Sequence, residues 1–220
     1  MALRHPKIAG NFYTNYQNVK ISYSDPSAAN DTVKVLQDAL GNDTASFNIF
    51  LDRVAYYGST VTGANITDYI MGGNNDDTII GGQGNDTMWG YQNFDISDAT
   101  SDNDVFKWNL GDAGASGATD TIKDFTKWNG MTGDKLSIYG LLSGFTPASS
   151  RLEDWVKTVA TGQTVNGVFN STVMTIDVDG PGSSAVTQVI QFEGINLLSG
   201  VSGTLAQQLA SLKTSGVFTV

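Results

Sequence analysis

The sequence has no cysteine and a single histidine, His5. Disulfide bonds and thiolate metal sites are therefore excluded, and a Ser–His or Cys–His catalytic pair has only this one imidazole available. The motifs GxSxG and HExxH and the P-loop are also missing. We therefore expect a protein that is not an enzyme.

Long hydrophobic runs are absent as well. No stretch approaches the roughly 18 consecutive apolar residues that a membrane-spanning helix needs, and we expect no membrane insertion. Residues 1–10 lack the basic and then apolar layout of a signal peptide. Hydrophobic residues still make up 40% of the 220-residue chain, which is enough to fill a core.

Basic residues are scarce: Lys and Arg number 12 against 22 for Asp and Glu, which gives a net charge of −10. Nucleic acid and anionic membrane surfaces are therefore not expected as partners, because both require a basic face. Glutamate is scarce too, with only Glu153 and Glu193, so the acidic residues are almost all aspartates. Aspartate favours turns and oxygen-rich cation sites.

The basic residues are also unevenly placed, since none lies between Arg53 and Lys107. Eight carboxylates without a counter-charge repel one another in a compact fold, so we expect a cation among them. The eight are Asp68, Asp76, Asp77, Asp86, Asp95, Asp98, Asp102 and Asp104.

This acidic stretch repeats with a period of nine residues. From Gly63 it reads GANITDYIM, GGNNDDTII, GGQGNDTMW, GYQNFDISD and ATSDNDVFK. Position six is aspartate in every unit: Asp68, Asp77, Asp86, Asp95 and Asp104. Position eight is apolar in four of the five units. Such self-similarity predicts stacked repeats, and Asp76 and Asp98, which fall outside position six, are expected to be solvated.

The composition of each unit predicts its shape. The Gly-, Asn- and Asp-rich half suits a turn, and the last three residues suit a short strand with one inward side chain. Two units then form a coil of about 18 residues, and successive coils stack as parallel strands about 4.8 Å apart. The aspartates align in columns, with expected neighbours Asp68 and Asp86, Asp77 and Asp95, and Asp86 and Asp104.

Stacked carboxylates at that spacing favour a hard divalent cation. Ca²⁺ accepts six to eight oxygens in irregular geometry and suits such a site better than Mg²⁺. Zinc is not expected without cysteine and with one histidine. The alternative is an ordinary β-solenoid in which these turns merely connect strands.

The units GGNNDDTII and GGQGNDTMW resemble the calcium-binding nonapeptide GGxGxDxUx of the RTX (repeats-in-toxin) family. The resemblance implies a parallel β-roll that binds several Ca²⁺ ions. The metal-ligating candidates are Asp68, Gly72, Gly73, Asn74, Asp77, Gly81, Gly82, Gly84, Asp86, Gly90, Asp95 and Asp104.

Two later segments, residues 120–125 and 133–142, are predicted to be strands separated by a turn. They resemble the DxIxDF and GDKL segments that follow RTX repeats in exported proteins. That resemblance implies that Asp120 and Asp124 close the last calcium site. The alternative is that both aspartates only bound a strand.

The flanking regions predict a mixture of helices and strands. Apolar stripes predict short helices over 30–41 and 47–58, and a Ser-x-x-Glu capping box at Ser150 predicts a helix through Val159. Residues 171–178 and 188–192 alternate as a strand pair, and 205–212 form an amphipathic helix that ends before Gly216.

The predicted fold is therefore mainly β: a short calcium-bound parallel β-roll between an N-terminal cap of helices and strands and a C-terminal β-rich segment with a few helices. The expected divisions are a capping region, 1–62, the RTX β-roll, 63–107, and a C-terminal capping and secretion-signal region, 108–220.

The last helix and apolar tail resemble the uncleaved C-terminal signal of type I exported proteins. From Asp104 onwards, the order of segments resembles the C-terminal target domain of large bacterial surface adhesins. The resemblance implies a calcium-dependent, non-catalytic folding and export module that meets the type I secretion machinery. It also implies a monomeric module of a longer chain, located outside a Gram-negative cell at its surface. The alternatives are a calcium-ordered ligand-binding or surface-layer module, and the tail of a secreted hydrolase.

Overall fold

The structure is a computed structural model of the chain. It describes residues 16–18, 22–23, 34–36, 47–50, 59–63, 65, 67–73, 76–91, 103–182 and 186–219. Its strands form two sheets, of nine and six strands, which we call the first and the second sheet.

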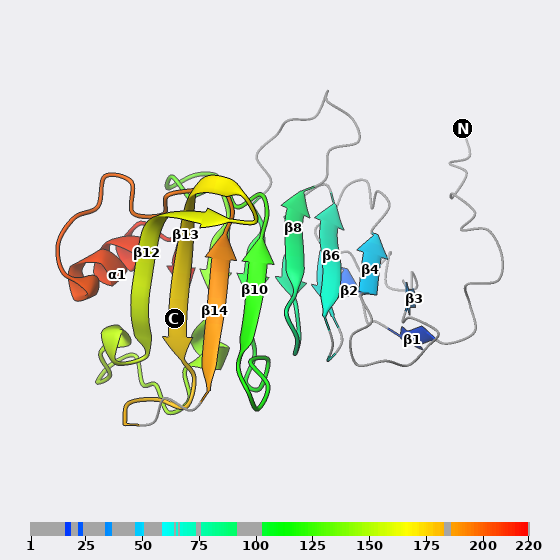
Figure 1. Ribbon diagram of the computed structural model, residues 1–220, viewed down its shortest axis with the longest axis horizontal. Coiled ribbons are helices and arrows are strands. Elements are labelled where there is room, and N and C mark those ends of the chain that lie inside the picture. The colour runs from blue at the N-terminus through cyan, green and yellow to red at the C-terminus, as the bar shows by residue number, and fades with distance from the viewer. Residues whose placement is uncertain are drawn as a thin grey trace.

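The first sheet is parallel in its middle, from β4 to β14, and antiparallel at both ends (Figure 1), and the second sheet is parallel from β15 to β5. The first sheet runs in the spatial order β1 (Tyr16–Asn18), β3 (Lys34–Leu36), β4 (Phe47–Phe50), β6 (Asp68–Gly73), β8 (Thr87–Tyr91), β10 (Ala118–Ile122), β14 (Thr187–Phe192), β13 (Val168–Asp177) and β12 (Val156–Val165). The second sheet runs in the order β15 (Phe218–Thr219), β11 (Lys135–Ser137), β9 (Val105–Lys107), β7 (Thr78–Ile80), β5 (Ser59–Thr62) and β2 (Ser22–Tyr23).

The chain winds between the two sheets as a β-roll. From β5 to β11, successive strands alternate between the second and the first sheet. Each strand from β5 to β9 pairs in parallel with the strand two places further along the chain. The predicted mainly β fold with a parallel roll is confirmed. The alternation continues past the nonapeptide units into β10 and β11, so the same winding carries the chain into its C-terminal region.

One apolar side chain from each turn of the roll fills its interior. In six strands, the residue two places after an aspartate is fully buried, as the repeat predicts for position eight. These residues are Ile70, Ile79, Met88, Phe106, Ile122 and Leu136. Because each coil supplies so little apolar area, stacking of neighbouring coils is what closes the core.

The C-terminal region adds a conventional core to the end of the roll. β12, β13 and β14 form an antiparallel meander that joins the roll through β14 and β10. Helix α1 (Leu205–Thr214) starts at a capping box on Thr204 and buries Leu209 and Leu212. Two short 3₁₀ helices, η2 (Tyr139–Leu141) and η3 (Leu152–Asp154), complete this part. Among the described residues, no helix has the length and apolar character needed to cross a bilayer.

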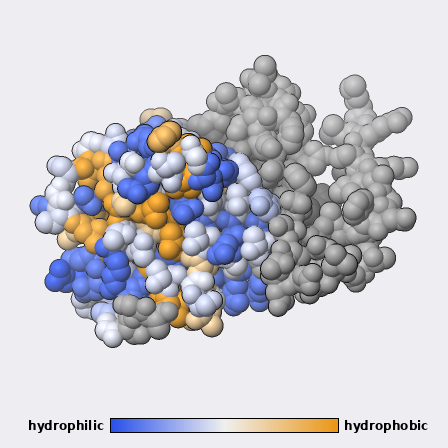
Figure 2. All heavy atoms as spheres, viewed as in Figure 1, coloured by the Kyte–Doolittle hydropathy of each residue, from blue (hydrophilic) through white to orange (hydrophobic). Residues whose placement is uncertain are grey.

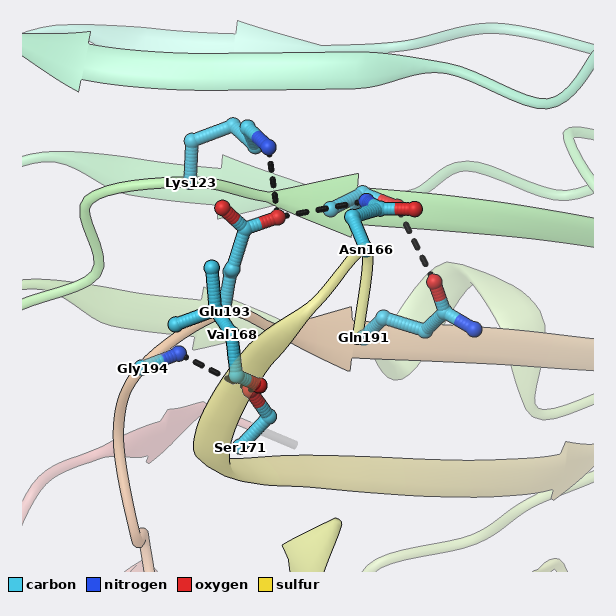
Figure 3. Close-up of polar contacts among 8 residues, drawn as sticks. Lys123, Asn166, Val168, Ser171, Gln191, Glu193 and Gly194 are labelled. Carbon is cyan, nitrogen blue, oxygen red and sulfur yellow. Dashed lines mark hydrogen bonds and ion pairs between the residues drawn. The ribbon is translucent and has the colours of Figure 1, made fainter. Parts of the chain in front are cut away.

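A group of polar side chains holds the meander to the roll (Figure 3). Lys123, just after β10, pairs with Glu193, just after β14, at 2.5 Å between Nζ and Oε2. The side chain of Asn166, in the turn between β12 and β13, donates to the same Glu193 oxygen at 3.2 Å. Nearby, the N–H of Gly194 donates to Ser171 Oγ at 3.0 Å. These contacts join the ends of three chain segments that are far apart in sequence.

The outward face of the first sheet changes character across its width. Figure 2 shows hydrophobic residues gathered over β12 to β14 and mostly hydrophilic residues over β10. Ala160 lies opposite Val173 across β12 and β13, and both are half-buried, as is Val189 on β14. The inward residues of the same strands, such as Met174 and Ile190, are fully buried. The alternation is that of a sheet with one covered face.

Two local predictions were wrong. Residues 34–36 and 47–50, expected within helices, form β3 and β4; the rest of those two helices lies outside the described residues. The helix predicted from Ser150 to Val159 is a single 3₁₀ turn followed by the strand β12. In both cases pairing with a neighbouring strand, β6 for β4 and β13 for β12, outweighs the local helical spacing of apolar residues. The strand pair and the C-terminal helix are confirmed.

Candidate metal centre: two columns of buried aspartates

Six aspartates form two columns at the turns of the roll. The first column contains Asp68, the first residue of β6, Asp86, just before β8, and Asp120, in the middle of β10. The second column contains Asp77, Asp104 and Asp134, which directly precede β7, β9 and β11 of the second sheet. All six are at most 4% exposed, which is rare for aspartate and requires compensating contacts.

Each carboxylate reaches back to the coil before it. In the first column, the N–H of Asp68 donates to Asp86 Oδ1 at 2.9 Å, and the N–H of Asp86 donates to Asp120 Oδ1 at 2.8 Å. In the second column, Asp104 Oδ1 accepts from the N–H of Asp77 at 2.8 Å, and Asp134 Oδ1 accepts from that of Asp104 at 3.0 Å. In each of the four accepting carboxylates, one oxygen therefore receives a hydrogen bond from a backbone N–H group. The four are Asp86, Asp104, Asp120 and Asp134.

The second oxygen of the repeat aspartates faces a glycine. A Cβ placed on Gly72 would lie 2.7 Å from Asp77 Oδ2, and one on Gly81 would overlap Asp86 Oδ2. The same relation holds for Gly63 with Asp68 and for Gly90 with Asp104. A side chain at these four positions would fill the space beside the carboxylate, so glycine there keeps the carboxylate turn open.

Backbone carbonyls lie at the same turns. The carbonyl oxygen of Gly81 lies beside Gly63, and that of Gly90 lies beside Gly72, one coil earlier in each case. Gly82 and Gly84 have φ values of 89° and 135°, which only glycine adopts readily, so the turn after Gly81 depends on them. The turns therefore present carboxylate and carbonyl oxygens together.

Burial and mutual repulsion raise the pKa values of these carboxyl groups. Burial, then the neighbouring Asp134 carboxylate, raises the pKa of Asp104 to about 9. Burial, then the Asp120 carboxylate, likewise raises the pKa of Asp86. Among the described residues, Asp86 Oδ2 is fully buried and has no hydrogen-bond partner. A charged carboxylate in that position is costly unless a proton or a cation compensates it.

The donor set fits a calcium ion. Within the described residues, no three His, Cys, Asp or Glu side chains converge on one point, so carboxylates alone do not make a site. A cation at these turns takes the rest of its ligands from backbone carbonyls. Oxygen ligands in irregular geometry suit Ca²⁺, and bound calcium supplies positive charge against the stacked carboxylates. The residues present therefore fit the group that the sequence predicts.

The column neighbours differ partly from those predicted. Asp68 and Asp86 are neighbours, as expected. The predicted pairing of Asp86 with Asp104 is wrong, because Asp104 belongs to the second column and stacks on Asp77. The reason is an extra stretch of chain: Gly90 and Asp104 face each other as Gly81 and Asp86 do, although they are nine residues further apart in sequence.

Other predicted ligands are distributed as follows. Asn74 and Asp95 lie outside the described residues. Asp124 accepts a hydrogen bond from the N–H of Gly90 at 2.9 Å, so it contacts the last glycine turn without being a member of a column. Asp134 was not among the predicted ligands, although it too stands two residues before a buried apolar residue, Leu136, which is the signal that could have found it.

Comparison with protein-family models agrees with the repeat. The family model of the RTX calcium-binding nonapeptide repeat (4 copies) matches residues 62–97. A search of curated proteins finds no similar sequence. Among solved structures, the solution structure of the R3 subunit of a mannuronan C5-epimerase from Azotobacter vinelandii is 17% identical, with a TM-score of 0.25, over 66% of this chain and 81% of that one. Residues 62–97 of this chain therefore carry the RTX calcium-binding nonapeptide repeat.

Proposed function

We propose that this chain is a non-catalytic module that folds on binding calcium and serves the export of a secreted protein. The observation that carries the proposal is the pair of buried aspartate columns beside open glycine turns, in which Asp86 Oδ2 has no hydrogen-bond partner among the described residues. A soluble protein gains nothing from such stacking unless a cation is present to offset it.

We assign the ligands to the two columns and their turns. The carboxylates of Asp68, Asp77, Asp86 and Asp104 face the glycines that open each turn, and the carbonyls of Gly81 and Gly90 lie one coil away. The remaining proposed ligands are assigned by the repeat pattern of the sequence: Gly72, Gly73, Asn74, Gly82, Gly84 and Asp95. The number of bound calcium ions then depends on how many of these turns supply a full set of oxygen ligands.

The columns make folding depend on the cation. At low calcium, unprotonated carboxylates repel one another, and no Lys or Arg between residues 53 and 107 offsets them. Extracellular modules bind calcium with dissociation constants of about 10⁻⁴ to 10⁻³ M. At a hundredfold excess over the dissociation constant, one site stabilises the folded state by about 2.7 kcal/mol, and several sites act together.

This dependence suits transport through a narrow channel. A chain that stays unfolded at cytosolic calcium can be threaded, and it folds on reaching a calcium-rich exterior. We therefore propose a type I secreted, surface-associated adhesin as the parent protein, with this module at its C-terminal end. Residues 108–220 then hold the signal for the secretion machinery, and residues 1–62 cap the other end of the roll.

A calcium titration tests the proposal. Circular dichroism should show a gain of β-structure and of melting temperature with Ca²⁺ but not with equal Mg²⁺. Asp86→Asn should raise the calcium midpoint at least tenfold. The matched control is Asp76→Asn, which removes an exposed carboxylate that accepts hydrogen bonds from Asn103, and its midpoint should stay within about threefold of the wild type. No response of the wild type to calcium contradicts the proposal.

A second candidate, a calcium-ordered ligand-binding module, is favoured by one observation. On β6 and β8, Tyr69 and Trp89 stack with ring centroids 6.4 Å apart and planes 26° apart, and Tyr69 is 38% exposed. Partly exposed stacked aromatic rings offer an apolar platform to a saccharide or peptide. A glycan array probed with the wild type and with Tyr69→Ala distinguishes the two: binding lost in the variant supports this candidate, and no binding by either leaves the folding module.

A further inference from the structure

The last aspartate of the first column differs from the others in what surrounds its second oxygen. Asp120 is fully buried, and its Oδ1 takes the N–H of Asp86 in the ordinary way. Its Oδ2, however, accepts from the indole Nε1–H of Trp108 at 2.7 Å and from the amide Nε2–H of Gln188 at 2.8 Å. Three protein donors thus surround the Asp120 carboxylate, whereas Asp86 Oδ2 has none among the described residues.

The last aspartate of the second column is surrounded in a similar way. Asp134 Oδ1 takes the N–H of Asp104, and its Oδ2 accepts from the backbone N–H of Thr126 at 2.7 Å. The donors at the two ends are unrelated: an indole and an amide side chain in one column, a backbone N–H in the other. The two columns belong to different sheets. The same outcome reached twice by different groups indicates a common requirement at the column ends.

The next strand in the first sheet confirms that this column ends there. β14 pairs in parallel with β10, and the residue opposite Asp120 is the buried Ile190. β14 therefore adds no carboxylate to the column at Asp120. Gln188, two residues earlier on β14, reaches back to Asp120 instead, so the strand that ends the column also supplies a donor. A charged carboxylate that receives several N–H donors is stabilised without a metal.

We propose that Asp120 and Asp134 end the two columns as carboxylates held by protein N–H donors in place of a cation, with Trp108 and Gln188 as the positioning residues at the first end. This inference rests on the proposed calcium-dependent function and narrows it. Calcium loads the columns as far as Asp86 and Asp104 and no further. The C-terminal region keeps its carboxylates satisfied without calcium, so it is folded before the repeats are.

The number of bound ions tests the first half of this proposal. Native mass spectrometry of the full chain at saturating Ca²⁺ compares wild type with Asp120→Asn and Asp86→Asn, two substitutions of the same size and charge change. Asp120→Asn should keep the wild-type number of ions, and Asp86→Asn should lose at least one. A loss in Asp120→Asn equal to that in Asp86→Asn overturns the inference. A wild type without bound calcium overturns the proposed function itself, which is a different result.

The second half of the proposal is that the C-terminal region is folded, with Asp120 held by N–H donors, before calcium binds. The indole of Trp108 tests it, and this test does not require an aspartate variant to fold. In the full chain without calcium, the Trp108 Nε1–H resonance, assigned by its disappearance in Trp108→Phe, should be present and protected from hydrogen exchange. Gln188→Leu should shift that resonance and keep the wild-type number of bound ions. A resonance that becomes protected only when Ca²⁺ is added, or a lost ion in Gln188→Leu, overturns the proposal.

Discussion

The repeat segment, residues 63–91, and the C-terminal region, residues 108–219, bury aspartates in different ways. In the repeat segment, Asp86 Oδ2 faces a glycine turn and has no hydrogen-bond partner among the described residues. In the C-terminal region Asp120 and Asp134 are surrounded by N–H groups. The same residue type, equally buried, therefore depends on an added cation in one region and on the chain itself in the other.

The two regions also differ in how much apolar core stands behind each strand. A coil of the repeat segment contributes one fully buried apolar side chain per strand, such as Ile79 or Met88. The C-terminal region packs large aromatic rings together, with Phe125 and Phe192 edge to face at 5.3 Å between centroids, and Phe145 against Trp155 at the same spacing. Stability that comes from side-chain packing persists without calcium, and stability that comes from the columns does not.

The largest effect is expected from closing a glycine turn. Gly81→Ala puts a methyl group onto Asp86 Oδ2, so we expect a loss on the order of 3 kcal/mol in the calcium-loaded protein and at least a tenfold rise in the calcium midpoint. Gly162→Ala is the control: φ is 69°, but no atom lies within 4 Å of the added methyl group, so about 1 kcal/mol is expected and the midpoint should not move. Equal calcium midpoints in Gly81→Ala and Gly162→Ala would contradict the claim that only the repeat segment depends on calcium.

Core truncations should separate the regions by their calcium dependence. Met88→Ala and Leu209→Ala each remove a buried side chain and should cost about 3 kcal/mol in calcium, measured by urea unfolding. Without calcium, Leu209→Ala should still lower the stability of the remaining structure, whereas Met88→Ala should have almost no effect. A large effect of Met88→Ala in chelator would mean that the repeat core forms without the cation.

The pH dependence of the calcium-free protein gives a smaller effect of defined sign. Burial raises the pKa of Asp104 in the folded state to about 9, against about 3.9 in an unfolded chain. The folded state therefore binds the proton more tightly, so the stabilisation is complete below about pH 4 and is lost as the pH rises to 9. In calcium-depleted buffer, protonation takes the place of the cation, so the β-structure of the repeats measured by circular dichroism should be greatest near pH 4 and be lost as the pH rises towards 9. A gain of β-structure with rising pH over that range contradicts the assignment.

The smallest effect is expected at a polar contact within the C-terminal region, where the meander meets the segment that follows β10. Glu193→Gln weakens the pair with Lys123 and the contact with Asn166 shown in Figure 3, and both partners of the pair are only partly exposed. We expect a loss of about 1 kcal/mol in urea unfolding and an unchanged calcium midpoint. A shifted midpoint would show that this contact transmits calcium binding to the C-terminal region.

The repeat was the part of the fold that the sequence predicted best. A nine-residue period with aspartate at position six predicts the roll, the inward residue two places later and the Asp68–Asp86 stacking, because turn chemistry and strand alternation are local properties. The pairing of Asp104 could not be found in this way. The chain between Gly90 and Asp104 is nine residues longer than the chain between Gly81 and Asp86. Because this extra length equals the repeat period, Asp104 still falls at position six, and the sequence pattern does not reveal the insertion.

The remaining differences between the sequence predictions and the structure, and the contacts that the sequence did not reveal, are made at long range. β4 and β12 have apolar residues at helical spacing, and only their partners β6 and β13 make them strands. Likewise, Asp120 and Gln188 are 68 residues apart, and nothing near either residue indicates that they meet. The sequence motif predicts a role for Asp120 from its position in a pattern. The residues that surround Asp120 in the structure include Gln188, which comes from β14, the neighbouring strand in the sheet.

The direction of the backbone-to-carboxylate hydrogen bonds gives each column a polarity. The amide of an earlier coil always depends on the side chain of a later one, as Asp68 depends on Asp86 and Asp77 on Asp104. A polypeptide released from its C-terminal end consequently has every acceptor in place before the matching donor arrives. Assembly in the opposite direction would leave each newly formed layer incomplete until its successor was made.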